Sequence, residues 1–448
     1  MPTHLRSALS AIRAPRAQSR SWVPIAAVAL PLLVASAACT DITSLAQENP
    51  GQVSVGDLYQ PANAQLLVNG AIADFECAFS RYTVGVGLFT DELANAIASS
   101  SNVDYDRRTL PSNGTYGTGT CGNNQQPPIY TTLSVARASA DTAVGKLSGW
   151  TDEQVPNRTK LIGQASAFAG YSLVLMGESM CSAAINLGPE IHPVDLFTEA
   201  KKRFDAAITA AKAVTPVDDS TLKFATLGRA RAQWDLGDLA SAATDAATIP
   251  STFVRNMTTN ATQVRQQNWV FASVNQSNWA TIDPSFRNLT VDNTGTPDPR
   301  TAVTNTGSKG TSQATPIWAA DKYSSLTSTI PIAKYAEAQL IIAESKEEAN
   351  DLAGAAAAIN AARSTHPGMP QYDPTGQTQA QVRAQVIEER RRELFLEGHR
   401  LGDIHHFNLA ILPATGSNYL TSGVYGDQTC FPLPDVERIN NPNIGNTP

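Results

Sequence analysis

The segment Val382–Phe407, VRAQVIEERRRELFLEGHRLGDIHHF, decides the fold prediction for this chain. Just before it, Thr378-Gln-Ala-Gln matches the Ser/Thr-x-x-Glu/Gln pattern of a capping box, so we expect a helix to begin there. One face of this helix carries residues at multiples of four: Val382, Val386, Leu394 and Gly398. The spacing therefore predicts a helix with an apolar stripe.

Charged residues lie on and beside this stripe: Glu388, Arg390, Arg391, Arg392, Glu393, Glu397 and Arg400. An arginine on an apolar face needs a carboxylate partner, because an unpaired buried charge is very costly. Within a single helix, Glu388 reaches Arg392 at four residues, and Glu397 reaches Arg400 at three. Spacing alone leaves two interpretations open: a solvated charged helix, or an internal ion network that fixes the fold.

The N-terminus has the pattern of an export signal. A basic region without acidic residues contains Arg6, Arg13, Arg16 and Arg20. The apolar run that follows, residues 22–38, is interrupted by Pro24 and Pro31 and is shorter than the roughly 20 residues of a membrane-spanning helix. It ends at Val-Ala-Ser-Ala-Ala-Cys39, which resembles a bacterial lipobox, although Ser36 replaces the usual Leu. We expect Cys39 to be lipidated; ordinary cleavage of a secreted protein is the alternative.

Removal of a signal peptide at residues 1–38 takes away the four arginines and changes the formal net charge from −7 to −11. An acidic protein is a poor candidate for binding nucleic acid, whose phosphates require a basic surface. We interpret residues 39–55, which are polar and rich in Gly, Pro and Ser, as a tether. Residues 56–448 are then expected to form a single domain.

Four cysteines remain after Cys39: Cys77, Cys121, Cys181 and Cys430. An even number of cysteines in an exported protein favours disulfides, and four cysteines allow three pairings. The sequence contains no Cys-x-x-Cys spacing, so a zinc site is not expected. The pairing stays open at this point.

Helical patterns recur along the chain, with a Gly- and Ser-rich loop region expected at residues 99–129. The expected helices before residue 220 cover residues 55–98, 130–150, 157–181 and 195–214. Residues 221–249 then combine Trp234, a Leu-Gly-Asp turn at Gly237 and many alanines, which resembles a tetratricopeptide hairpin. An ordinary helical hairpin is the alternative.

Residues 250–330 change in character, being rich in Thr, Asn, Ser, Gly and Pro but also in aromatic residues. So many aromatics are not typical of a disordered linker, so we expect an ordered, loop-rich excursion with short strands or helices. Helical order returns at residues 334–364, with a turn expected at Gly354. The count is about eight helices, or four antiparallel pairs, followed by an extended tail after Cys430.

Catalytic spacings are missing from the sequence. Gly177-Glu-Ser-Met-Cys181 stops short of a Gly-x-Ser-x-Gly elbow, and Gly85-Val-Gly87 has no third glycine for a dinucleotide loop. His399, His405 and His406 match no zinc or iron spacing. We therefore expect neither an enzyme, nor a metal site, nor a cofactor.

Binding is better supported, because sugar sites combine aromatic platforms with polar partners. The loop-rich excursion offers this mixture, and the candidate ligand-binding residues are Trp269, Asn275, Trp279, Arg287 and Trp318. The alternative for each tryptophan is that it simply anchors a loop to the helical body.

Four features together resemble the SusD/RagB family of nutrient-binding outer-membrane lipoproteins. They are the lipobox Cys39, the helical segment KYAEAQLIIAESKEEANDLAGAAAAINAARS (334–364), the motif EERRRELFLEGHRLGDIHHF (388–407), and the tail FPLPDVERINNPNIG (431–445). The element Asp298-Pro-Arg300 is also similar to the family pattern. The motifs cover residues 331–448 most strongly. Gly402 departs from the pattern, in which an aromatic residue is common at this place.

The resemblance implies a mainly α-helical array of about four tetratricopeptide-like pairs with a large loop-rich ligand-binding region. It implies a lipid-anchored protein of the outer membrane, facing the exterior, that delivers glycans or other nutrients to a SusC-type TonB-dependent transporter. The family motif residues are structural by this reading and identify no ligand contact. The alternative function is a tetratricopeptide-like scaffold lipoprotein that binds peptide or protein partners.

Overall fold

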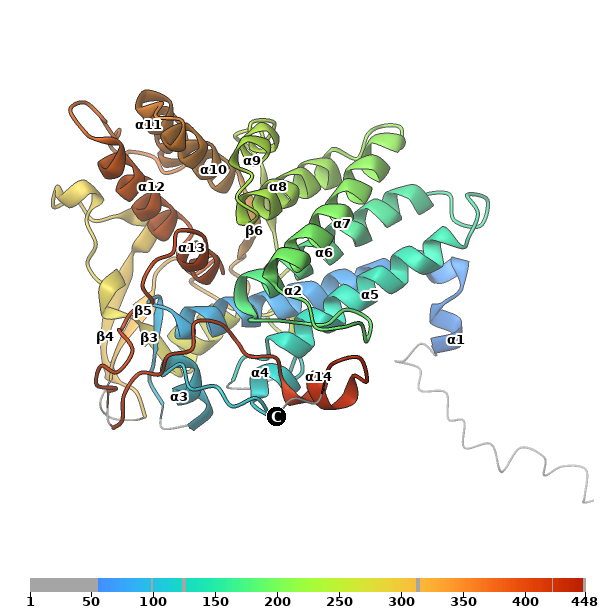
Figure 1. Cartoon of the computed structure of the whole chain (residues 1–448), viewed down its shortest axis with the longest axis horizontal. Coiled ribbons are helices and arrows are strands. Elements are labelled where there is room, and N and C mark those ends of the chain that lie inside the picture. The colour runs from blue at the N-terminus through green and yellow to red at the C-terminus, as the bar shows by residue number, and fades with distance from the viewer. Residues whose placement is uncertain (1–54, 98–99, 123–125, 312–314, 421, 446–448) are drawn as a thin grey trace, which may run out of the picture. The chain divides into compact units, whose positions relative to one another are not determined.

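Helices packed in pairs make up most of the computed structural model (Figure 1). It describes residues 55–97, 100–122, 126–311, 315–420 and 422–445. Four pairs follow one another along the chain: α2 (Ala64–Phe89) with α5 (Tyr130–Ser148), α6 (Arg158–Ser179) with α7 (Pro193–Ala213), α8 (Asp219–Asp235) with α9 (Leu239–Ala246), and α10 (Tyr335–Glu348) with α11 (Leu352–Arg363). The predicted mainly α-helical array of about four pairs is confirmed.

Glycines allow neighbouring pairs to approach closely, and Phe204 of α7 shows how. A Cβ on Gly170 of α6 would lie 2.7 Å from the Phe204 ring, and a Cβ on Gly228 of α8 would lie 2.4 Å from it. The ring therefore occupies the space that these two glycines leave on either side. Tyr171 also contacts Phe204 edge-on, with the ring centroids 5.1 Å apart. Close packing of this kind makes the register of the pairs specific.

The turns within the last two pairs use left-handed residues. Gly237 has a φ of +77° between α8 and α9, as the Leu-Gly-Asp pattern predicts. The turn between α10 and α11 lies at Asn350, with a φ of +57°, and at Asp351, which caps α11 by accepting from the Gly354 amide. The turn expected at Gly354 is therefore wrong by a few residues. Gly354 lies in the first turn of α11, where Asp351 is the N-cap signal.

The loop-rich excursion contains short antiparallel strand pairs, as expected. β1 (Leu93–Asn95) pairs with β3 (Ala280–Ile282), β2 (Val254–Asn256) pairs with β6 (Pro331–Lys334), and β4 (Val303–Lys309) pairs with β5 (Pro316–Ala320). Two of these pairings connect the excursion to other parts of the chain. The β1–β3 pair attaches it to the end of α2, and the β2–β6 pair brings its two ends together at α10.

Two regions expected to lack helices contain short ones. Residues 99–129 include α3 (Ser100–Asp106) and α4 (Thr115–Thr118), and the tail includes α14 (Asp435–Asn440). A short first helix, α1 (Val55–Leu58), precedes α2. Asp435 at the start of α14 pairs with Arg438 one turn later, which supports the helix locally. The prediction of an extended tail is therefore wrong for this stretch.

The stretch around Val382–Phe407 forms two helices, α12 (Gln379–Glu393) and α13 (Arg400–His406). The capping box at Thr378 and Gln381 is confirmed. The prediction that one helix contains both Glu388 and Arg400 is wrong, because Leu396 and Gly398 adopt positive φ angles of +55° and +78°. Gly398 also lies against Tyr82, where a Cβ would approach the ring to 3.2 Å. The break turns α13 back toward α2 and α6.

The four cysteines that follow Cys39 form two disulfides. Cys77 in α2 bonds Cys121, and Cys181 at the end of α6 bonds Cys430 in the tail. Both bonds join helical pairs to connecting segments. The predicted signal peptide, the lipidation site Cys39 and most of the tether lie outside the described residues. Within the described part of the chain, no helix is long and apolar enough to span a bilayer.

Candidate functional site

The sequence-predicted ligand residues separate into buried and partly exposed ones. Trp269 is 1% exposed, and the Arg81 guanidinium lies 4.1 Å from its ring centroid. Asn275 donates to the carbonyls of Ala320 and Tyr323 and accepts from the Ala320 amide. Its amide group thus holds the end of β5. Trp269 offers no free surface to a ligand, whereas Asn275 is partly exposed, and a ligand contact by either residue stays a prediction.

Trp279, Arg287 and Trp318 remain partly exposed. Arg287 lies 5.3 Å from the centroid of the Trp318 ring and donates two hydrogen bonds to the Ile282 carbonyl. Trp279 packs against the buried Trp269 with the ring centroids 5.9 Å apart. The Trp318–Arg287 pair is therefore a rigid aromatic and cationic feature at the surface of the loop-rich region.

The charged residues of α12 and α13 form an internal ion network. Arg390 is 2% exposed and bonds Asp403 at 2.7 Å, while Arg392 bonds Glu388 at 2.6 Å and Asp298 at 3.2 Å. Two interpretations of this segment were open: a solvated charged helix and an internal ion network. At Arg390 the structure shows the internal ion network. Arg390, Asp403 and Asp298 are buried, whereas Glu388 and Arg392 are partly exposed.

Arg391 belongs to the same network at its edge. It bonds Glu388 at 3.1 Å and lies 4.0 Å from the centroid of the Phe286 ring. Its Nη2 also donates to the Ser285 carbonyl at 2.8 Å. Arg391 thereby connects α12 to the loop-rich excursion.

The expected pair between Glu397 and Arg400 does not form, because the helix ends between them. Glu397 instead accepts from Lys322 at 2.6 Å and Lys334 at 2.9 Å, and Arg400 bonds Asp91 at 2.6 Å. These contacts join the segment between α12 and α13 to the loop-rich excursion and to the end of α2. The correction follows from the backbone at Leu396 and Gly398, which spacing alone does not reveal.

Glu393 is an acid of the network that its cationic neighbours keep ionised. It bonds Lys334 at 3.0 Å and His366 at 2.9 Å. Burial alone would raise the pKa of Glu393, but Lys334 and His366 lower it to about 2. A carboxylate held this way stabilises the fold and is not available as a proton donor at neutral pH.

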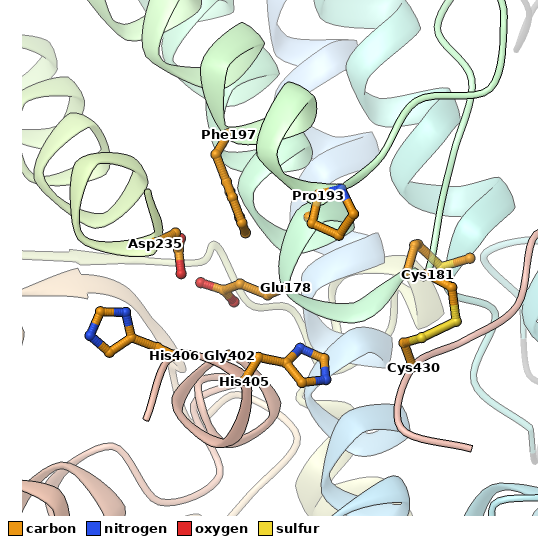
Figure 2. A pocket seen from close by; sticks show the side chains of 11 residues that line it. Glu178, Cys181, Pro193, Phe197, Asp235, Gly402, His405, His406 and Cys430 are labelled. Carbon is orange, nitrogen blue, oxygen red and sulfur yellow. A yellow bond between two sulfur atoms is a disulfide. The ribbon is translucent and has the colours of Figure 1, made fainter. Parts of the chain in front are cut away.

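A separate pocket of about 350 Å³ lies between four helices (Figure 2). It opens where the C-terminal ends of α6 and α8 meet the first residues of α7 and one side of α13. Its walls include Phe197 and Pro193 of α7, His405 of α13 and the Cys181–Cys430 disulfide. Its polar end carries two acids, Glu178 of α6 and Asp235 of α8, whose carboxyl groups point toward each other in Figure 2.

Glycines shape this pocket. A Cβ on Gly177 would lie 2.4 Å from the Phe197 ring, and a Cβ on Gly402 would lie 2.8 Å from the Glu178 carboxyl carbon. The missing side chains leave room for the aromatic wall and for the acid. Gly402 is the position at which the sequence departs from the family pattern, and its lack of a side chain keeps the pocket open above Glu178.

The two acids have different surroundings. Glu178 accepts from the buried Arg231 through both oxygens, at 2.6 Å each. Asp235 Oδ2 is buried and has no hydrogen-bond partner among the described residues. Burial and the neighbouring Glu178 raise the pKa of Asp235 well above its usual value, while the charges of Arg231 and Arg390 oppose this shift.

This pocket was not predicted from the sequence, although the sequence contains one signal for it. Glu178 is the single acidic residue of α6, and most of the helix after Leu161 is buried. A lone carboxylate on a buried helix requires a partner or a polar cavity. The histidines next to it have structural partners: His406 stacks on Trp234 at 3.6 Å and bonds Glu344, while His405 bonds the Thr429 carbonyl.

The composition of the pocket suits a small polar ligand. Within the ranges that the structure describes, no three His, Cys, Asp or Glu side chains are grouped as metal ligands. An aromatic wall opposite paired carboxyl groups is a composition that small polar ligands use. The ring provides an apolar face, and the acids accept or donate hydrogen bonds.

Comparison with known proteins identifies the family. Residues 187–428 match the model of the SusD family. Solved structures share the fold: a SusD superfamily protein from Bacteroides vulgatus (14% identity, 86% of this chain and 98% of that chain, TM-score 0.62), a SusD-like carbohydrate binding protein from the same organism (15%, 86% and 97%, 0.62), and surface glycan-binding protein A from Bacteroides fluxus (13%, 85% and 96%, 0.60).

No curated protein matches the sequence. The family match covers more than half of the chain, from the loop before α7 to the segment after α13, and so includes the motif of α12 and α13. The helical pairs and the solved structures agree with it over the whole described body. The chain belongs to the SusD family.

Proposed function

We propose that this protein binds glycans and delivers them to a SusC-type TonB-dependent transporter of the outer membrane. The observation that carries the proposal is the pocket between α6, α7, α8 and α13, in which the Phe197 ring faces the acids Glu178 and Asp235. Sugars present apolar faces bordered by hydroxyl groups, which such a pocket complements. Two of the structural relatives are named as carbohydrate- or glycan-binding proteins.

The partly exposed Trp318–Arg287 pair supports a second contact area on the loop-rich region. A long glycan is able to contact the indole face while a single unit occupies a pocket elsewhere. Trp279 is the other partly exposed candidate of that region. In this proposal the ion network of α12 and α13 holds the scaffold and contacts no ligand, and the protein performs no catalysis.

The proposed location follows from the N-terminal sequence. Residues 1–38 act as a lipoprotein signal peptide, Cys39 carries the lipid, and residues 39–55 form the tether of the binding domain at the cell exterior. Fractionation tests the anchor: wild type is expected in the outer-membrane fraction, and Cys39→Ala in the soluble fraction. A Cys39→Ala protein that stays in the membrane would contradict lipidation at this residue.

The binding function is tested with the purified protein on a glycan array and, in parallel, on a peptide array. The proposal expects saccharide binding that Phe197→Leu weakens at least tenfold. Binding to peptides but to no polysaccharide would favour the scaffold alternative. Co-purification with the native protein tests the transport partner. A TonB-dependent transporter is expected to be recovered, and truncation of the anchor or of the tether is not expected to abolish its recovery.

A further inference from the structure

The pocket contains more carboxyl groups than the surrounding arginines neutralise. Arg231 directs Nε and Nη2 to Glu178, and Arg390 directs Nε and Nη2 to Asp403. Asp235 forms no ion pair with a residue that the structure describes, although the charges of Arg231 and Arg390 act on it from a distance. The two arginines therefore balance two of these acids, and Asp235 is in excess.

A further acid lies behind the pocket. Glu337 is 1% exposed, its nearest cation is Arg231 Nη1 at 3.9 Å, and neither of its carboxyl oxygens has a hydrogen-bond partner among the described residues. Burial raises the pKa of Glu337 to about 7. The interior next to the pocket therefore holds one more acid without a close ion-pair partner among the described residues.

The other side chains that line the pocket supply no positive charge to offset the excess of acids. From α13, His406 bonds Glu344 and His405 bonds a backbone carbonyl. From α7, the lining residues are Pro193 and Phe197, which carry no charge. The disulfide forms the remaining wall. A ligand that enters the pocket therefore meets an unsatisfied acid, an aromatic ring and no free cation.

We propose that this pocket binds the protonated amine of a small hydroxylated ligand, with Asp235 as the group that receives the ammonium and Phe197 as its apolar wall. This inference rests on the proposed glycan-binding function and narrows its ligand to saccharides that carry an amine. An ammonium group supplies both the positive charge and the hydrogen-bond donors that Asp235 Oδ2 lacks.

Other ligand classes fit the pocket less well. A carboxylate of an acidic sugar would meet Asp235 and Glu178 with like charge, which costs binding energy in a partly buried site. A neutral hydroxyl satisfies one hydrogen bond but leaves the charge excess in place. The volume of about 350 Å³ lies at the small end of ligand pockets, which suits one sugar unit or one amine-bearing side chain.

Binding of an ammonium ion at Asp235 is linked to release of a proton. Burial and Glu178 raise the pKa of Asp235 in the free protein, and the incoming positive charge favours the carboxylate. Affinity for an amine is therefore expected to increase with pH over the range in which the amine itself stays protonated. The proton leaves to buffer, so calorimetry in two buffers of different ionisation enthalpy counts it.

The test is isothermal titration calorimetry of the full-length protein with glucosamine, glucose, glucuronate and lysine. Glucosamine is expected to bind at least tenfold more tightly than glucose, glucuronate not at all, and binding at pH 6 is expected to release up to one proton. If lysine binds as tightly as glucosamine, the ammonium site stands and its natural source is a peptide or amino acid.

Asp235→Asn is the diagnostic variant, because it keeps the shape and removes the charge. It is expected to abolish the preference for glucosamine over glucose and the proton release. Asp219→Asn, at the exposed other end of the same helix, is the matched control and is expected to change neither. Should Asp235→Asn fail to fold, Phe197→Leu takes its place and is expected to weaken glucosamine binding at least tenfold.

Equal affinities for glucose and glucosamine, or an unchanged preference in Asp235→Asn, would overturn the ammonium site. Glycan-array binding that persists in that case, and that Trp318→Ala weakens, would leave the general glycan function intact. Loss of all saccharide binding in the wild-type protein would instead refute the proposed function. The two failures are thus distinguishable.

Discussion

The guanidinium of Arg390 in α12 lies over the indole ring of Trp234 in α8, with Cζ 4.1 Å from the ring centroid, and also bonds Asp403 of α13. One buried side chain thus joins the family motif to the third helical pair. The cation–π contact and the ion pair both involve the Arg390 guanidinium. Removal of this guanidinium leaves Asp403 buried without its ion-pair partner.

Arg390→Met is therefore expected to destabilise the protein by about 3–5 kcal/mol, the cost of breaking a buried pair on one side. Urea unfolding followed by circular dichroism measures it. Arg391→Met is the matched control and is expected to cost less, because Arg391 is partly exposed and Glu388 keeps Arg392 as a partner. Equal stability of wild type and Arg390→Met would refute the role of this pair.

Glu92 makes stability depend on pH in an identifiable direction. It accepts from the Leu396 amide at 2.7 Å through Oε1, while Oε2 is buried without a partner among the described residues. Burial raises the pKa of Glu92 to about 8, above its value in the unfolded chain. The folded state therefore holds a proton that the unfolded state loses, and stability falls as the pH rises from about 4.5 to 8.

Glu92→Gln is expected to remove this slope, which amounts to about 1 kcal/mol per pH unit for one proton. The variant should resemble wild type at pH 5 and be the more stable protein at pH 8. Thermal unfolding at both pH values checks this. A variant that is less stable than wild type at pH 8 would show that Glu92 is ionised there.

The two disulfides are expected to contribute unequally to stability. Cys181–Cys430 closes a sequence separation of 249 residues, and Cys77–Cys121 closes one of 44. In the chain-entropy model the longer loop is worth about 5 kcal/mol and the shorter about 4 kcal/mol. Replacing each pair by alanines and measuring urea unfolding should show the larger loss for Cys181 with Cys430; the opposite order would exclude this mechanism.

Trp269 and Trp318 are expected to respond differently to substitution. Trp269→Ala leaves a cavity in the core and is expected to cost about 3–5 kcal/mol of stability. Trp318→Ala removes a partly exposed ring, so it should change stability little and weaken glycan binding. Unfolding curves and glycan affinities measured on both variants separate the two roles. A Trp318→Ala protein with unchanged affinity would show that this indole only packs against Arg287.

Much of the helical array was predictable because its determinants are local. The Thr378 capping box, the Leu-Gly-Asp turn at Gly237 and the alanine-rich hairpins express their structure within a few residues. The break at Leu396 was not predictable in this way. Leu is a good helix former, and its positive φ is maintained by tertiary contacts, among them the bond from its amide to Glu92.

The candidate site was harder to predict for the same reason. Trp269 and Trp318 lie in one polar, aromatic-rich segment, and nothing in their sequence surroundings indicates that Arg81 covers only the first. The pocket collects Glu178, Phe197 and Asp235 from three helices, which are neighbours only after the pairs have packed. Composition identifies residues suited to binding, and packing selects those that reach a cavity.

Two contacts at the end of α2, one ion pair and one hydrogen bond, also constrain how the chain folds. Asp91 bonds Arg400 and Glu92 bonds the Leu396 amide, across sequence separations of 309 and 304 residues. Contacts between residues so far apart slow folding, because the intervening chain must be ordered first. An N-terminal fragment leaves both acids without these partners. Folding is therefore completed only when the segment containing Leu396 and Arg400 docks against the first helical pair.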